Sequence, residues 1–393
     1  MENKIKNGNR NIHLEILKQN INEIKKILNT KNKNKIINLQ NNLGDTPLHL
    51  SVRYHFNDIS ELLLSEPKIN IKIKNNYEND ILFEAILCDN NYVIDLILNK
   101  LNFKLNFNYK SLNDISYFHM AIKQNNLLIL NFIKNIDNLY NYQDSDGNSL
   151  LHYAAYYERE NYLNILKKFN FDFDIKNNFD ENVLNYYINS KKKKYKIIEM
   201  IVSDINSLDS NYNNCLINLL INFKNVENNI IKFFIKKKIN LYHSNESEIS
   251  PLLQTILNDS YKNFNFILKN INDVNYVSHQ TNSILHIYFY LKNNLNLKYL
   301  KKLLNHNFDL NNININLDSS MHMFCENQKL NKSYLDLLIK YNGNFFIKNE
   351  EDEMPYDSLS KTEQTYINKK IFKKDCVKNI TSCINKIPKL KNE

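Results

Sequence analysis

The chain contains little glycine, proline or cysteine, and no tryptophan. Its 393 residues include 4 Gly, 5 Pro and 5 Cys. The glycines are isolated from one another, which excludes a glycine-rich phosphate-binding loop. The cysteines are odd in number and show no C-x-x-C spacing, so the sequence favours free thiols in a reducing compartment over a disulfide framework. These cysteines are Cys88, Cys215, Cys325, Cys376 and Cys383.

Long hydrophobic runs are also absent. Residues 1–20 contain no apolar segment of the kind found in secretory signal peptides. No stretch approaches about 18 uninterrupted apolar residues, the length needed for a transmembrane helix. We therefore expect an intracellular protein without a membrane span, and the cytoplasm is the expected compartment.

The charge of the chain is modest. The net charge is +9, from 51 Lys and Arg against 42 Asp and Glu, and most basic residues are lysines scattered among asparagines and isoleucines. This composition gives only weak support to nucleic-acid binding. Two lysine runs, residues 191–194 and 236–238, leave nuclear import or an anionic-surface patch open. Each run adjoins an expected helix end, where a solvated basic cluster is favourable, and we prefer this simpler interpretation.

The strongest positive signal in the sequence is a repeat. The stretch 144–177 reads as a tight turn at Asp146 and Gly147, a short helix with the small pair Ala154 and Ala155, a second helix and a return loop. Weaker copies recur, and a marker position in each copy lies 34, 36, 33, 33, 32, 36, 33, 36 and 35 residues from the one before. The markers are Thr46, Asp80, Ser116, Ser149, Asn182, Asn214, Ser250, Ser283, Ser319 and Met354. So regular a period predicts one elongated array in place of several globular domains.

Five of the copies carry histidine three residues after the marker. These are His49, His119, His152, His286 and His322. With the runs from Asp45 to His49 and from Ser149 to His152, the pattern resembles the ankyrin repeat, a unit of about 33 residues in which a β-turn precedes two antiparallel helices. The resemblance covers residues 41–370. It implies an all-α ankyrin-repeat solenoid of about nine to ten helix-turn-helix units with short hairpin-like loops.

The two ends of the array are expected to differ from its centre. Residues 1–40 carry apolar residues at helical spacing and predict a capping pair of short helices. Residues 41–370 form the array itself. Residues 371–393 form a basic C-terminal tail, for which we prefer a capping helix followed by a frayed end, with a targeting tail as the alternative.

The copies at Asn182 and Asn214 depart most from the pattern. Tyr186 and Tyr187 stand where small residues are expected, so either the curvature changes locally or the helix packs poorly. The glycines that usually follow ankyrin helices are missing as well. We expect asparagine in their place, because it tolerates the left-handed backbone conformation better than other residues.

No arrangement of residues predicts catalysis or a cofactor. Successive histidines should lie about one helix-pair thickness, roughly 10 Å, apart, too far to share a metal, and in ankyrin repeats such a histidine bonds the backbone of the next repeat. His322 and Cys325 supply two ligands, fewer than zinc needs. Asp144 and Asp146 resemble a calcium loop, but its twelfth position is Ala155 in place of glutamate, which favours a simple turn. We expect no enzyme, no metal and no cofactor.

The resemblance implies that function resides on the surface. An ankyrin array presents a long concave face made of hairpin tips and the exposed side of its inner helices. Tyrosine offers contact area at low entropic cost and is enriched at interfaces. The predicted partner-binding residues are Arg53, Tyr54, Lys123, Tyr153, Tyr156, Tyr157, Tyr288 and Tyr290.

Two binding functions remain open, beside a third class, a toxin or modifying enzyme with an unrecognised site. The favoured one is a non-enzymatic scaffold, a monomer that binds an unidentified protein on the concave face. The degenerate repeats are similar to those of ankyrin proteins from AT-rich viruses, intracellular bacteria and parasites, so the cytoplasm of a host cell is an alternative location. The other class binds nucleic acid or an anionic surface through the lysine runs, and such binding should weaken steeply with salt.

Overall fold

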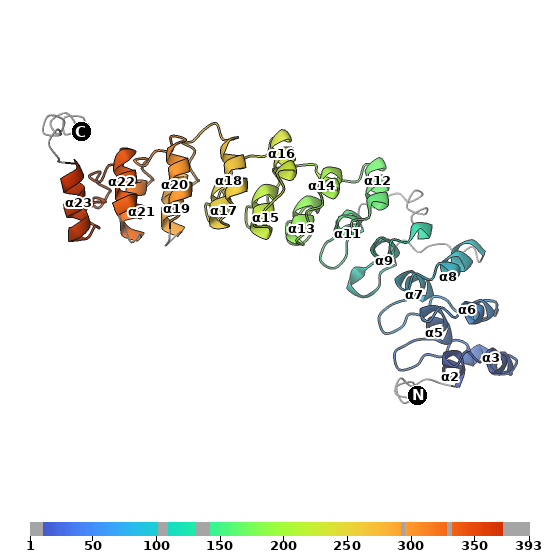
Figure 1. The fold of residues 1–393 in the computed structure, drawn as a ribbon. Helices are drawn as coiled ribbons and strands as arrows, with labels where there is room; N and C mark the ends of the chain where they lie inside the picture. Colours follow the sequence, from blue (N-terminus) through green and yellow to red (C-terminus); the bar gives the residue numbers. More distant parts are fainter. Residues whose placement is uncertain (1–10, 101–108, 130–141, 292–294, 328–331, 372–393) are drawn as a thin grey trace, which may run out of the picture. The chain divides into compact units, whose positions relative to one another are not determined.

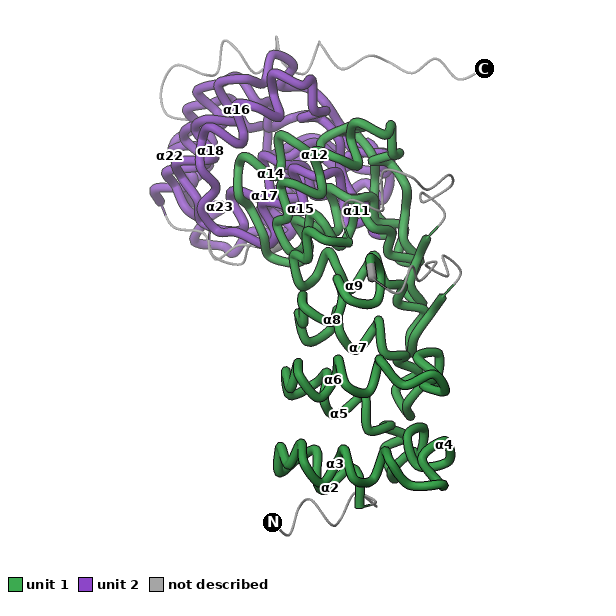
Figure 2. Tube along the Cα trace, turned by 90° about the vertical axis from the view of Figure 1, so that its right-hand side faces the viewer, with its two compact units in different colours: residues 1–210 green, residues 211–393 purple. Residues whose placement is uncertain are grey.

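The computed structural model of this chain describes most of its residues as two compact units. One unit spans residues 1–210 and the other residues 211–393 (Figure 2). The described residues are 11–100, 109–129, 142–291, 295–327 and 332–371. They form helices, and isolated bridges are the only β-type pairing among them, which confirms the all-α prediction. None of the described helices is long and apolar enough to cross a membrane.

In the first unit, short helices alternate between an inner and an outer row (Figure 1). The inner helices are α2 (Asn11–Leu17), α5 (Pro47–Arg53), α7 (Ile81–Leu87), α9 (Tyr117–Gln124), α11 (Leu150–Tyr156) and α13 (Val183–Asn189). The outer helices are α3 (Ile21–Leu28), α6 (Asn57–Leu64), α8 (Asn91–Asp95) with the π-helix η1 (Leu96–Lys100), α12 (Glu160–Lys168) and α14 (Tyr195–Ile201). Two short pieces, α4 (Lys33–Ile36) and the 3-10 helix η2 (Leu112–Asp114), lie in the loops.

The second unit repeats this alternation. Its inner helices are α15 (Cys215–Asn222), α17 (Pro251–Leu257), α19 (Ile284–Leu291) and α21 (Ser320–Asn327). Its outer helices are α16 (Asn228–Lys236), α18 (Tyr261–Leu268), α20 (Leu297–Leu304) and α22 (Lys332–Lys340), and α23 (Lys361–Ile371) follows them. The predicted tail beyond α23, residues 372–393, lies outside the described residues.

The predicted markers are the residues at which the inner helices begin. The Thr46 hydroxyl accepts from the N–H of His49, and the Asp80 carboxylate accepts from the N–H of Phe83. Each side chain thereby satisfies a backbone N–H that the first turn of a helix leaves unpaired. Every other marker also directly precedes an inner helix, except Met354, which precedes a turn. Each repeat is named below by its marker.

The Asn182 repeat packs its tyrosines without losing its helix. The Tyr187 side chain is fully buried, and its hydroxyl donates to Glu158 Oε1 at 2.9 Å and accepts from the N–H of Lys194 at 3.1 Å. Tyr186 stays half-exposed with its ring edge-on to that of His152. Poor packing is therefore excluded at Tyr187, because both the ring and its hydroxyl have partners.

The hairpin loop before each inner helix has a left-handed residue two positions before the marker. Glycine fills this tip position at Gly44, with a φ of 72°, and at Gly147, with a φ of 78°. The other tips are Glu78, Asp114, Asp180, Tyr212, Glu248, Thr281, Leu317 and Asp352. Asparagine is expected after the helices, not at these tips. It does occupy left-handed positions after outer helices, at Asn170, Asn307 and Asn342.

Candidate functional site

A ladder of histidines joins successive repeats. In the Thr46 repeat, Nδ1 of His49 accepts from the N–H of Thr46 at 3.1 Å, so the proton lies on Nε2, which donates to the carbonyl of Asn79 at 3.1 Å. The other rungs run from His119 to the carbonyl of Asn148 (3.2 Å), His152 to Glu181 (3.1 Å), His286 to Asp318 (2.9 Å) and His322 to Glu353 (3.1 Å). The predicted role of these five histidines is confirmed.

The N-terminal helix pair adds a rung that was not predicted. His13 in α2 is fully buried, and its Nε2 lies 3.1 Å from the carbonyl oxygen of Asp45. The signal was present in the sequence, because His13 lies 36 residues before His49, within the range of the repeat spacing. The expected helices are present as α2 and α3, and α2 packs against α5 as one inner helix on the next.

Burial keeps four histidines of the ladder neutral. Desolvation lowers the pKa of His119 and of His152 to about 4, and it also lowers the pKa of His49 and of His286. Protonation would place a hydrogen on Nδ1, directly against the backbone N–H that this nitrogen accepts. These histidines are therefore fixed hydrogen-bond bridges with no proton to exchange near neutral pH.

A second ladder, built of asparagines, was also not predicted. Five positions before every marker stands Asn, Asp or Ser. The Asn75 side chain, for example, accepts from the N–H groups of Tyr77 and Asn79 and closes the hairpin. Its amide also donates to the preceding repeat. Such bonds join Asn75 to Asp45 (3.0 Å), Asn177 to Asn148 (3.1 Å), Asn245 to Asn213 (2.9 Å), Asn314 to Asn282 (3.0 Å) and Asn349 to Asp318 (2.9 Å).

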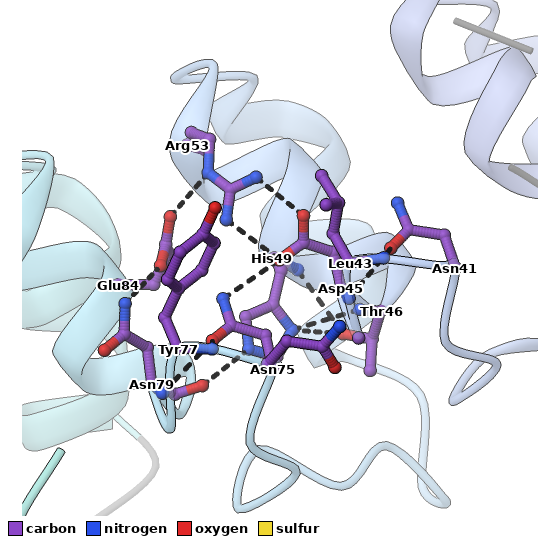
Figure 3. A network of polar contacts seen from close by, with 12 residues as sticks. Asn41, Leu43, Asp45, Thr46, His49, Arg53, Asn75, Tyr77, Asn79 and Glu84 are labelled. Carbon is purple, nitrogen blue, oxygen red and sulfur yellow. Dashed lines mark hydrogen bonds and ion pairs between the residues drawn. The ribbon is translucent and has the colours of Figure 1, made fainter. Parts of the chain in front are cut away.

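Arg53 joins two repeats through an ion-pair network (Figure 3). Its Nη1 and Nη2 donate to the two oxygens of Asp45 at 2.6 and 2.8 Å, and its Nε donates to Glu84 at 2.6 Å. The side chains of Asp45 and Glu84 are 0% and 2% exposed, whereas that of Arg53 is 26% exposed. Burial alone would lower the pKa of Arg53, but these hydrogen bonds raise it. Most of the binding capacity of Arg53 is thus used inside the fold.

Four half-exposed tyrosines, Tyr153, Tyr156, Tyr157 and Tyr186, form a tyrosine cluster on α11, its C-terminal cap and α13. The ring centroid of Tyr156 lies 5.0 Å from that of Tyr157 and 5.9 Å from that of Tyr186. Tyr153 lies 6.0 Å from Tyr157 and meets His119 edge-on at 4.7 Å. The rings therefore fix one another and are tied to the histidine ladder beneath them.

Two cations flank the tyrosine cluster. The Lys192 Nζ lies 4.8 Å from the ring centroid of Tyr156, and the guanidinium carbon of Arg159 lies 6.0 Å from that of Tyr157, both within cation–π distance. Tyr153 donates its hydroxyl to Asp144 at 2.9 Å. Among the residues the structure describes, the hydroxyls of Tyr156 and Tyr157 have no hydrogen-bond partner, so they remain available to a ligand.

Distance from the marker decides which predicted binding residues reach solvent. Side chains seven and eight positions after the marker are exposed or half-exposed on the inner helices. Arg53, Tyr54, Lys123, Tyr156, Tyr157 and Tyr290 occupy these positions. Tyr54 and Tyr290 are 52% and 65% exposed. Tyr290 belongs to the second unit and the others to the first.

The prediction that Tyr288 is a partner-binding residue is wrong. It stands five positions after its marker, as Ala154 does, and this position faces the outer helix. Its side chain is fully buried, and its hydroxyl accepts from the N–H of Asn296 at 3.3 Å. Burial removes Tyr288 from the candidate surface. The repeat register alone could have shown this.

The lysine runs lie where the sequence placed them, but one is engaged with acidic groups. Residues 191–194 lie between α13 and α14, and residues 236–238 at the end of α16. Lys194 lies 3.5 Å from Glu160, which also pairs with Lys196 at 2.5 Å. These pairs reduce the positive field available to nucleic acid at this end of α14.

The candidate metal positions do not form a site. Within the ranges described above, no three His, Cys, Asp or Glu side chains gather closely enough to hold a metal ion. The Asp144 carboxylate instead accepts from the N–H groups of Asp146 at 3.0 Å and Asn148 at 2.8 Å, as in an ordinary turn. The predicted turn is confirmed.

Comparison with known proteins finds, in one segment of the chain, the family that the sequence pattern resembles. A family model described as Ankyrin repeat matches residues 43–76. No curated protein matches the chain. A crystal structure of the ankyrin repeat domain of Bcl-3, described as a unique member of the IkappaB protein family, is similar with a TM-score of 0.46 and 15% identity over 56% of this chain and 98% of that chain. Ankyrin repeats are generally protein–protein interaction modules, and the family is typically non-enzymatic. The match at residues 43–76 and the histidine rungs that recur from repeat to repeat support the ankyrin-repeat family for this chain.

Proposed function

We propose that this chain is a non-enzymatic scaffold that binds a partner protein through the tyrosine cluster of its first unit. The observation that carries this proposal is the state of Tyr156 and Tyr157. Both rings are half-exposed and held by neighbouring rings, and both hydroxyls are without partners among the described residues.

Fixed tyrosines suit protein recognition for an entropic reason. Ordering a mobile side chain on binding costs free energy, and that cost is small where the ring is already held by its neighbours. Each ring also offers an apolar face and a polar hydroxyl, a combination enriched at the centres of interfaces. Tyr54 and Lys123, which share the exposed register of inner helices, extend the proposed surface along the first unit. Tyr290 is a separate proposed contact on the second unit.

Affinity recovery from cell extract at physiological salt tests this proposal. The intact chain is compared with a Tyr156→Ala/Tyr157→Ala double variant and with Tyr92→Ala, a matched control on outer helix α8 whose ring is 40% exposed. We expect a defined protein to be captured by the intact chain and the control, and at least tenfold less by the double variant. Unchanged helicity by circular dichroism is required of all three chains.

Two outcomes would count against the proposal. Equal capture by the intact chain and the double variant would show that the tyrosine cluster is structural. Recovery of RNA that is lost at about 0.5 M salt and is equal for all three chains would instead support the basic-patch alternative, because counterion release makes such contacts strongly salt-dependent.

A further inference from the structure

A hollow of about 480 Å³ lies on the first unit where the histidine ladder is interrupted. Phe83 takes the histidine position in the Asp80 repeat and has no group to donate to the next repeat. The carbonyl of Ile115, which a histidine would reach, accepts from the N–H of Ser111 at 2.9 Å, as the equivalent carbonyl does in the other hairpins. The hydroxyl of Ser111, at 3.1 Å, takes the place of the histidine as its second donor. Both Phe83 and Ile115 line the hollow, so the missing rung and the open space coincide.

The sides of the hollow are apolar and partly open to solvent. They include Leu43, Tyr77, Leu87, Leu112 and Met120. Tyr77 and Leu112 are 54% and 55% exposed, so both offer apolar surface to a ligand. The volume falls within the range of sites that hold ligands of moderate size, about 300–1,000 Å³.

A few polar groups at the hollow have unused hydrogen-bonding capacity. The bonds of Arg53 to Asp45 and Glu84 use three N–H groups of a guanidinium that has about five. The Asn79 amide nitrogen donates to Glu84 at 3.2 Å, and its oxygen has no partner among the described residues. Figure 3 shows Tyr77 beside Arg53, Glu84 and Asn79. A donor and an acceptor in one hollow match the carbonyl and N–H of a peptide group.

The charge at this end of the hollow is negative. Asp45 and Glu84 carry two carboxylates against the single guanidinium of Arg53, which leaves a net charge of −1. The adjoining charges of Lys74 and Lys110 are paired with Glu78 at 2.9 Å and with Asp114 at 3.4 Å, and Lys123 does not line the hollow. A cationic ligand group is therefore favoured over an anionic one.

We infer that this hollow, a second site beyond the proposed tyrosine surface, binds an extended segment of a partner protein in which a large apolar side chain adjoins Lys or Arg. The apolar side chain packs against Leu112 and Met120. The adjacent peptide carbonyl accepts from the unused N–H groups of Arg53, and the basic side chain lies toward Glu84.

Selection from a random dodecapeptide library displayed on phage, with the full chain as bait, tests this inference. We expect the enriched peptides to share an apolar residue next to Lys or Arg and to be poor in Asp and Glu. A fluorescent peptide carrying the shared motif is then titrated against two matched variants, Leu112→Lys and Leu112→Glu. Because Leu112 is 55% exposed, both substitutions leave the core intact. We expect Leu112→Glu to bind the peptide at least tenfold more tightly than Leu112→Lys.

The outcomes separate this site from the tyrosine cluster. Binding that survives Tyr156→Ala/Tyr157→Ala and responds to the charge at position 112 supports the hollow. Absence of an enriched motif, an acidic motif, or equal binding to the two position-112 variants overturns the inference. Peptide binding that requires Tyr156 and Tyr157 alone also overturns it, but leaves the proposed function standing.

Discussion

The Thr46 and Asp80 repeats are neighbours with the same helical plan, yet they join to the next repeat in different ways. From the Thr46 repeat, His49 donates to the carbonyl of Asn79, and the hairpins meet through the N–H of Asn76, which donates to the carbonyl of Leu43 at 3.0 Å. From the Asp80 repeat, Phe83 makes no such bond, and the hollow opens there.

At the junction between the Asp80 and Ser116 repeats, tyrosine hydroxyls take the place of the absent histidine. The Tyr109 hydroxyl accepts from the N–H of Asp80 at 2.9 Å and donates to the carbonyl of Glu78 at 2.5 Å. Its ring stacks on that of Tyr117 with centroids 4.2 Å apart, and the Tyr117 hydroxyl donates to Asp80. An ankyrin junction can thus be held by buried aromatic residues while its loop side stays open for a ligand.

Replacing Arg53 should cause the largest loss of folding stability, because its side chain is bonded to both the hairpin before the Thr46 repeat and the Asp80 repeat. Arg53→Met leaves the buried carboxylates of Asp45 and Glu84 without their cation. Breaking such a pair on one side costs about 3–5 kcal/mol. Urea denaturation followed by circular dichroism measures the loss.

Lys26→Met is the control for Arg53→Met. Lys26 pairs with Glu23 at 3.0 Å on an exposed surface, with 74% of its side chain accessible. Such exposed pairs contribute less than about 1 kcal/mol. If the two variants lost stability equally, the Arg53 network would have no special role in joining the repeats.

Acid should weaken junctions of the histidine type and spare the Phe83 junction. The pKa of His119 and of His152 is about 4 in the folded chain, below the ordinary value of 6.5. The unfolded chain therefore binds more protons between these values, and stability present above pH 6.5 is lost as the pH falls toward 4. The loss is on the order of 3 kcal/mol for each histidine.

Hydrogen exchange as a function of pH locates this acid effect. We expect protection in α9, α11 and α13 to fall between pH 6.5 and 4, and His152→Asn to reduce the pH dependence while lowering stability at pH 7. His55→Asn is the control, because His55 is exposed and its left-handed backbone suits asparagine. A pH dependence unchanged in His152→Asn would argue that carboxylates, and not the histidine ladder, respond to acid.

The tips of the hairpins that precede α5 and α7 offer a matched pair of substitutions. Gly44 and Glu78 occupy the same register with φ of 72° and 60°. A Cβ on Gly44 would lie 2.5 Å from Asn76 Oδ1 and 2.7 Å from Asn76 N, so Gly44→Ala meets both backbone strain and the next hairpin. We expect it to lose about 2 kcal/mol.

Glu78→Ala should change stability by less than about 0.5 kcal/mol, since a Cβ is already accommodated at that position. Thermal unfolding of both variants gives the comparison. Similar losses for Gly44→Ala and Glu78→Ala would mean that the close contact with Asn76 contributes nothing to the junction.

The features that could be predicted are those set by fixed offsets along the chain. A marker with a short polar side chain caps the helix that follows, and a histidine three residues later reaches the next repeat, so Thr46 and His49 suffice to place both. The burial of Tyr288 also follows from its offset, although we counted it as exposed. The solenoid, its helix starts and most of the exposed inner-helix positions were therefore readable from the sequence.

Some of the contacts that escaped prediction, unlike the asparagine ladder and the His13 rung, join side chains whose pairing does not recur from repeat to repeat. Arg53 reaches Glu84 because two side chains 31 positions apart happen to converge, and the sequence holds no marker for that pairing. Beside the hollow, Phe83 packs against Tyr109, whose side chain is only 5% exposed. The Tyr109 hydroxyl finds Asp80 and Glu78 by tertiary packing, which local propensity does not encode.

Among the test substitutions, as distinct from their controls, the one with the smallest expected effect on stability is also the one whose sign the family pattern would predict wrongly. Phe83→His restores the family histidine, but the N–H of Asp80 already bonds Tyr109, and the carbonyl of Ile115 already accepts from both the N–H and the hydroxyl of Ser111. The new imidazole would be buried where Phe83 is 2% exposed, without the partners that His49 has. We expect a loss of about 1–2 kcal/mol in urea denaturation, the cost of a buried polar group left unpaired. A gain in stability would show that the tyrosine-held junction can convert to the histidine type, and that the hollow is a gap in the ladder without a role of its own.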